Sequence, residues 1–152
     1  MYQVVVFVHV LCAIIWVGGA FYSQLLAARA QRSPDPDDLP RIGRHLGVLG
    51  SRVFMPASLL LFIAGVVLVI QAWSFGQLWI AISMGLWVLS ALIGSMYIGP
   101  RAKKAGQLFY TEGPSSVAAR AEFGRVLTVS RLELVSFAII VALMVFKPGA
   151  GG

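Results

Sequence analysis

Charged residues are scarce in this sequence of 152 residues. Asp, Glu, Lys and Arg together make up 12% of it, compared with about 25% in soluble domains. Apolar residues make up 59%, where about 45–50% is usual. This composition excludes an ordinary cytosolic domain and a disordered chain, and it predicts a small integral membrane protein.

Cysteine and histidine are also rare, and recognisable catalytic motifs are missing. The one cysteine, Cys12, excludes a disulfide framework and a multi-cysteine metal cluster. His9 and His45 are the only histidines. The chain has no Ser/His/Asp constellation, no phosphate-binding glycine loop and no paired carboxylates within an apolar run. Any chemistry must therefore depend on a few isolated side chains.

Four apolar runs are long enough to cross a bilayer, which takes about 20 residues for about 30 Å of hydrocarbon. Each is expected to be helical, because hydrocarbon contains no water to satisfy open backbone groups. We expect an all-α, four-helix membrane bundle that forms a single domain over residues 1–152. The runs cover residues 2–28, 53–73, 78–98 and 126–146.

Basic residues exceed acidic ones, 12 against 6, but they are not arranged for nucleic acid. Eleven of the twelve lie in the segments 29–52 and 99–125 or just beyond them, and only Lys147 lies at the other side. The positive-inside rule then makes both segments cytoplasmic loops and places both termini outside. The partner of the chain is therefore the lipid bilayer, and no nucleic acid is expected.

Each basic loop is expected to contain further helix. In the first, a helix should begin near Pro40 and enter the membrane near Arg52, because proline is favoured in the first helical turn. In the second, residues 113–116 should break the chain ahead of an extension of the last helix. Small residues in the spans favour close packing, either within the bundle or against a second copy or a membrane partner.

His9 is the most informative polar residue of the first span. Ionisable side chains within a span are functional candidates by default. Cys12 and Trp16 lie three and seven residues further on and share its helix face. A histidine beside a thiol can bind copper or ligate heme. The alternatives are a neutral histidine that donates a hydrogen bond to a neighbouring helix, or a proton relay.

His45 cannot share a metal with His9, because the two should lie about 30 Å apart across the bilayer. Met84 and Met144 should instead lie at the depth of His9. A metal site of His9, Cys12, Met84 and Met144, or a His/Met heme b, is one hypothesis. Ordinary packing of both methionines is the alternative.

Arg52, Arg131 and Glu133 should lie near the inner boundary of the membrane. Arg131 and Glu133 are two residues apart and face different ways, so we expect Glu133 to pair with Arg52 and Arg131 to extend to the headgroups. Such a pair could be purely structural. The three residues could also bind an anion or a heme propionate, or carry protons.

Several motifs are similar to those of an uncharacterised bacterial family of predicted integral membrane proteins. The first span contains His9-x6-Trp16-x-Gly18-Gly19, which resembles the opening of that family. The similarity continues through residues 50–58, 75–79, 99–100 and 144–149. It implies a multi-pass protein of the bacterial inner membrane.

A broader group, which contains the copper-resistance protein CopD and HemJ-type protoporphyrinogen oxidases, shares this outline. Its characteristic positions are occupied here by His9, Arg52, Pro56, Lys147 and Pro148. The chain has Ser83 or a neighbour in place of a third-span lysine, and it lacks the second histidine. The resemblance thus implies a related scaffold with porphyrin or metal affinity through His9, without the oxidase reaction.

Two function hypotheses follow from these residues. In the first, the chain is a redox or metal-handling protein that binds heme b or copper through His9 beside Trp16, with Arg52, Arg131 and Glu133 orienting a charged group. In the second, it is a cofactor-free structural or accessory subunit that packs against itself or a membrane partner. The position of the His9 ring, either beside an open space or bonded to another helix, distinguishes them.

Overall fold

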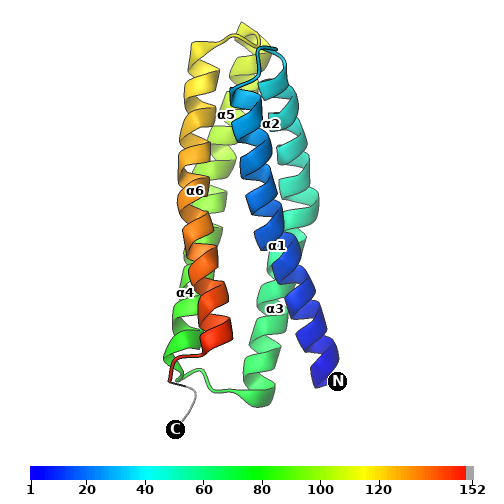
Figure 1. Ribbon diagram of the computed structural model, residues 1–152, viewed down its shortest axis with the longest axis vertical. Coiled ribbons are helices and arrows are strands. Elements are labelled where there is room, and N and C mark those ends of the chain that lie inside the picture. The colour runs from blue at the N-terminus through cyan, green and yellow to red at the C-terminus, as the bar shows by residue number, and fades with distance from the viewer. Residues whose placement is uncertain (150–152) are drawn as a thin grey trace.

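Four long helical rods lie side by side in the computed structural model, which describes residues 1–149 (Figure 1). The first rod is α1 (Tyr2–Gln31) and the last is α6 (Val117–Phe146). The two rods between them each contain a short π-helical segment. The second consists of α2 (Asp38–Leu49), η1 (Gly50–Phe54) and α3 (Met55–Ala72), and the third of α4 (Leu78–Ile93), η2 (Gly94–Ile98) and α5 (Gly99–Glu112).

All four rods are long and apolar enough to cross a membrane. They contain 30 or 35 residues, which corresponds to about 45–53 Å at 1.5 Å per residue. Because the hydrocarbon is only about 30 Å thick, each rod extends well beyond it. The expected four-helix membrane bundle is thus confirmed.

The segments expected to be long loops are mainly helical. Residues 29–52 and 99–125 form the ends of the rods, and only residues 32–37 and 113–116 turn the chain. The helix expected near Pro40 is α2, which begins at Asp38. The break expected at 113–116 is present as well: Gly113 adopts a left-handed φ of 89°, and the Ser116 hydroxyl accepts a hydrogen bond from the Ala119 amide at 3.1 Å.

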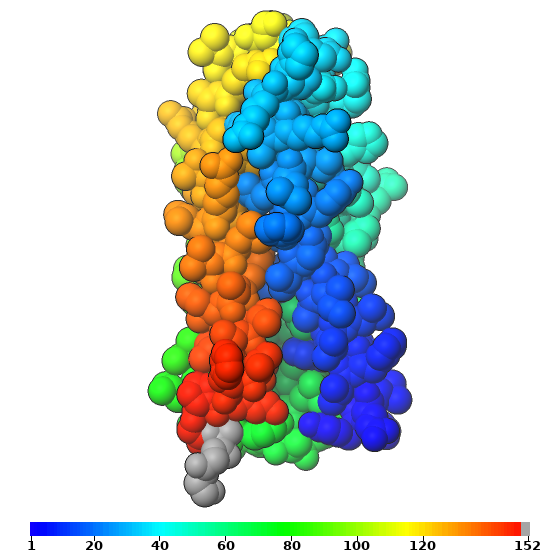
Figure 2. Space-filling model, in the orientation of Figure 1, coloured from blue at the N-terminus to red at the C-terminus, as the bar shows by residue number. Residues whose placement is uncertain are grey.

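The two ends of the bundle differ in character. We call the upper end in Figure 1, formed by residues 29–44 and 101–125, the basic end. The lower end, with the connection 73–77, the start of α1 and the end of α6, is called the terminal end. The body is elongated (Figure 2), and nine of the twelve basic residues lie within the two segments that form its basic end.

A compact core holds the basic end together. Small residues allow α1, α5 and α6 to approach closely, and Leu39 of α2 closes the cluster with 1% of its surface exposed. Away from the hydrocarbon, this burial stabilises the helical extensions through the hydrophobic effect. The core consists of Ala27, Ala30, Leu39, Ala105, Phe109, Ala119, Phe123 and Leu127.

A second core joins α3, α4 and α6 at the terminal end. Its buried members are Val69, Trp79 and Ile80, and Met84 and Met144 pack against them. Trp79 is only 3% exposed, and its ring meets that of Trp73 edge-on with centroids 5.3 Å apart. Both methionines therefore have a packing role here.

The two π-helical segments have the same sequence pattern, Gly-Ser-x4-Pro, at residues 50–56 and 94–100. In each, an amide bonds to the carbonyl five residues earlier, from Met55 to Gly50 and from Gly99 to Gly94. The proline that follows lacks an N–H and would crowd an α-helical carbonyl, and a wider turn relieves this conflict. In both rods a π-helical segment thus joins the membrane span, α3 or α4, to the helix that extends toward the basic end, α2 or α5.

Gly19 allows α1 to approach the second rod closely. A Cβ atom at Gly19 would overlap the Phe54 ring, whereas one at the neighbouring Gly18 would meet nothing within 4 Å. The two adjacent glycines therefore differ in their packing roles.

We predict that Gly19→Ala destabilises the protein by about 1–3 kcal/mol, because the rigid Phe54 ring must move. Gly18→Ala is the matched control and should leave stability unchanged or slightly raised, since alanine favours helix. Thermal unfolding in detergent measures both variants. Equal effects of the two substitutions would contradict the proposed difference in packing.

Candidate functional site

His9 joins two helices of the bundle. Its Nδ1 atom lies 3.0 Å from the carbonyl oxygen of Leu61 in α3. Gly65, one turn further along α3, makes room for the ring: a Cβ atom there would lie 3.1 Å from the His9 Cε1 atom. A carbonyl can only accept, so Nδ1 donates and carries the ring proton, which leaves Nε2 as the free nitrogen.

The side chains expected beside His9 are mostly engaged in packing. Cys12 is buried, with 6% of its surface exposed. The Trp16 ring packs against Phe137 of α6, with centroids 4.2 Å apart and planes tilted by 44°. The first hypothesis required room beside Trp16 for a planar ligand, and Phe137 occupies one side of that ring.

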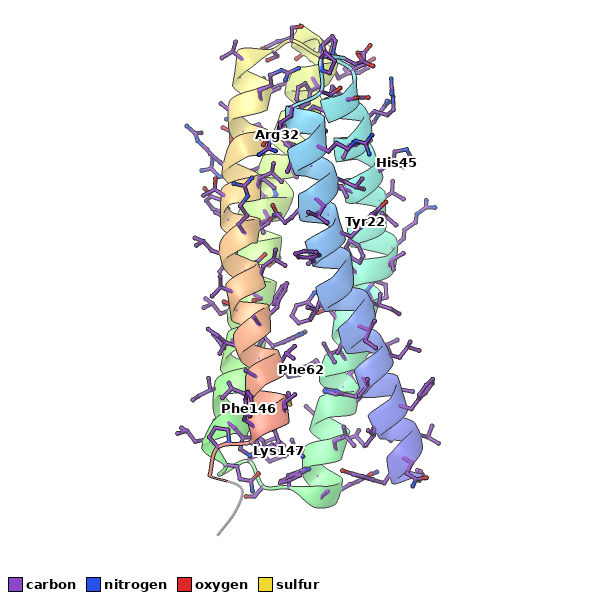
Figure 3. All side chains as sticks on the ribbon, in the orientation of Figure 1. Tyr22, Arg32, His45, Phe62, Phe146 and Lys147 are labelled. Atoms are coloured by element: carbon purple, nitrogen blue, oxygen red, sulfur yellow. The ribbon has the colours of Figure 1, made fainter. Side chains whose placement is uncertain are left out.

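Residues 1–149 contain no group of three or more His, Cys, Asp and Glu side chains that could hold a metal. His45 lies on α2 toward the basic end (Figure 3), while His9 contacts α3 in the opposite half of the bundle. The two histidines are therefore apart, as the sequence predicts.

The expected pair between Arg52 and Glu133 is not formed within 4.0 Å in the described part of the chain. Arg52 belongs to the π-helical segment η1 and is exposed, whereas Glu133 is half-buried on α6. The segment η1 packs mainly against α1, α2 and α3, whereas α6 packs mainly against α1, α4, α5 and η2, so Arg52 and Glu133 lie on elements that are not packed together. Arg131 is also exposed, which suits its expected position near headgroups.

A cluster that the sequence analysis missed surrounds Glu122 at the basic end. This residue is 6% exposed, and its carboxylate accepts hydrogen bonds from Arg101 at 2.9 Å, Lys104 at 3.0 Å and Arg125 at 3.1 Å. The spacing of Glu122 and Arg125 was a usable signal, since residues three apart are neighbours on a helix. Arg101 and Lys104 join them only because α5 and α6 fold back on each other at residues 113–116.

The cluster keeps Glu122 ionised. The hydrogen bond from Lys104, supported by the one from Arg101, lowers the pKa of the Glu122 carboxyl, while its burial acts in the opposite direction. Glu122 precedes the apolar run 126–146, so it lies on the helical extension of α6. Its negative charge therefore holds α5 and α6 together at the basic end.

Two cavities are found at this end of the molecule. One of about 350 Å³ lies beside the Glu122 cluster and is lined by Met96, Tyr97, Pro100, Arg101, Lys104 and Glu122. Another of about 550 Å³ lies where α1 turns into α2 and is lined by Leu25, Ala28, Arg29, Arg32, Ser33, Pro34 and Asp38. Both combine apolar and cationic side chains.

We predict that acid weakens the α5–α6 contact. A carboxyl whose pKa is lowered by folding stabilises the protein above its ordinary pKa, and this contribution is lost as the pH falls through the folded value. The melting temperature in detergent should therefore fall as the pH is lowered from about 5 to about 3, near and below the usual glutamate pKa. Glu122→Gln should lower the melting temperature at pH 6 and reduce its pH dependence.

Asp37→Asn supplies the control, because it removes an exposed carboxylate outside this cluster. It should keep the acid response of the wild type. An unchanged pH dependence in Glu122→Gln would show that other carboxylates cause the acid response.

The comparison with known families agrees with this architecture. The model of a family described as Predicted integral membrane protein (DUF2269) matches residues 3–148. Neither a curated protein nor a solved structure matches the chain at a significant level. The match extends from the start of α1 to just beyond the end of α6, and the chain therefore belongs to this family of integral membrane proteins.

Proposed function

We propose that this chain is a structural or accessory subunit of the bacterial inner membrane that works without a bound cofactor. The observation that carries the proposal is the hydrogen bond from His9 to the Leu61 carbonyl. His9 is the most prominent candidate for a metal or heme ligand in the membrane spans, and this bond uses its side chain to connect α1 with α3.

The surroundings of His9 support this role. Polar groups in hydrocarbon need an internal partner, and hydrogen bonds between membrane helices contribute on average about 0.6 kcal/mol and at most about 1.7 kcal/mol. Gly65 of α3 leaves space for the His9 ring. Trp16, two turns beyond His9 on α1, packs against Phe137 of α6. His9, Gly65 and Trp16 thus serve contacts between helices.

An accessory role requires a surface for another membrane helix, and α4 offers one. Ala81 and Gly85 are four residues apart, and both are exposed. Nothing lies within 4 Å of a Cβ atom built at Gly85. Small residues at this spacing allow a second helix to approach closely in lipid, so we place the contact with a second copy or a membrane partner here.

The proposed orientation follows from the grouped basic residues. Arginine and lysine close to the membrane favour the cytoplasmic side. In this proposal the basic end is cytoplasmic, and both termini and the connection 73–77 are outside.

A second candidate function, heme b or copper binding in a redox or metal-handling role, is favoured by one detail of the same histidine. Metal-bound histidines usually donate their other N–H to a carbonyl or carboxylate. The bond from Nδ1 to Leu61 leaves Nε2 free in this manner. Arg52, Arg131 and Glu133 would then orient a charged group, as the first hypothesis states.

Substitution of His9 separates the two candidates. We predict that His9→Ala lowers the stability in detergent by about 0.6 kcal/mol, the average contribution of a hydrogen bond between membrane helices. His9→Asn should recover most of this loss, because its amide N–H can replace Nδ1 as the donor to Leu61. The melting temperatures of the three proteins measure the effect.

The same preparations are examined by visible spectroscopy and elemental analysis, before and after incubation with heme b or copper(I). The proposed function predicts no Soret band and no stoichiometric copper in the wild type. A cofactor that is bound by the wild type and lost in both His9→Ala and His9→Asn would overturn it and establish the second candidate.

Cysteine labelling tests the orientation. Ser74 and Ser115 are exposed at opposite ends of the bundle, and the native Cys12 is buried. In intact cells a membrane-impermeant maleimide should label Ser74→Cys, and it should label Ser115→Cys only after the membrane is opened. The reverse pattern would contradict the proposed orientation.

A further inference from the structure

The cavity beside Glu122 has two chemically different sides. On the side of the span, Met96 is 75% exposed, and Pro100 and Tyr97 complete an apolar surface. On the other side are the charged groups of Arg101 and Lys104. A ligand that fits both sides must combine an anionic group with an apolar part.

The cations of this site are held in place but not fully neutralised. Arg101, Lys104 and Arg125 share one carboxylate, that of Glu122, so two positive charges remain. Arg125 offsets much of the charge of Glu122, which would otherwise repel an approaching anion.

Arg101 and Lys104 also keep free hydrogen-bond donors. Arg101 uses Nη1 for Glu122, and its guanidinium lies 4.4 Å above the centre of the Tyr97 ring. A guanidinium has five N–H donors and an ammonium three. Each side chain therefore has donors left for a phosphate oxygen, the acceptor that arginine binds best in a bidentate manner.

The site lies where the membrane span ends. No charged residue occurs between Arg52 and Arg101, so Arg101 is the first charge after the third apolar run. Met96 and Tyr97 belong to the π-helical segment η2 that closes this run. The apolar side of the cavity is thus at the level of acyl chains, and the cationic side is at the level of headgroups.

We propose that this cavity binds an anionic phospholipid, with its phosphodiester on Arg101 and Lys104 and the start of an acyl chain on Met96 and Pro100. Basic pockets at the ends of membrane helices recognise anionic headgroups by this combination of charges and apolar contact. The site does not involve His9, so the inference stands apart from the proposed function.

Binding is measured by native mass spectrometry of the purified protein in detergent, titrated with phosphatidylglycerol, phosphatidylcholine or inorganic phosphate. The wild type should bind phosphatidylglycerol more tightly than phosphatidylcholine. Arg101→Gln/Lys104→Gln should weaken phosphatidylglycerol binding about 30-fold, since each cation near the surface contributes about 1 kcal/mol. Lys104→Gln alone, at a side chain that is 61% exposed, should weaken it about 5-fold.

Arg44→Gln/Lys103→Gln is the matched control, because both residues are exposed and lie outside this cavity while the change in net charge is the same. It should keep the preference of the wild type. An equal loss in the control would show attraction by the overall charge of the basic end and overturn the proposal. Inorganic phosphate that binds as tightly as phosphatidylglycerol would overturn the assignment to a lipid in favour of a free anion. If the double variant loses its fold, the Lys104→Gln result decides alone.

Discussion

The absence of water from hydrocarbon is the constraint on which this structure depends. Backbone groups there must bond within the chain, so the polypeptide crosses in four uninterrupted helical rods and turns only where water is available. Pro56 near the start of α3 and Pro100 near the start of α5 would break this continuity in a regular helix. Wider π turns over residues 50–54 and 94–98 keep the backbone helical through both of them.

Because the rods are longer than the membrane is thick, the protein stabilises its two ends by different means. The basic end lies beyond the hydrocarbon and has an alanine-rich core together with the buried carboxylate of Glu122, which three cations surround. The terminal end has an aromatic core around Trp79, and the Lys147 ammonium lies 4.5 Å from the centre of the Trp73 ring. Between them, His9 supplies a polar link from α1 to α3.

Much of the fold could be predicted from the sequence, but less of the candidate site. The four spans, the helix near Pro40 and the break at 113–116 follow from local patterns. The bond of His9 to a neighbouring helix was one of the open alternatives. The cluster at Glu122 was missed because Arg101 and Lys104 precede it by 21 and 18 residues. The pair of Arg52 with Glu133 was wrong, because local spacing does not show which rods are neighbours, and η1 packs mainly against α1, α2 and α3 rather than against α6.

The sequence by itself determined that the chain enters a membrane, how often it crosses, and that most of its basic residues gather toward one end. These properties depend on the length, hydropathy and charge of contiguous segments, and each segment makes its own backbone hydrogen bonds. Only the tertiary structure decided which polar side chains meet. Which side chains meet depends on how each helix is rotated about its own axis, and successive residues of a helix point in directions that differ by about 100°. Contacts such as Gly19 with Phe54 and His9 with Gly65 set this rotation between segments far apart in the chain.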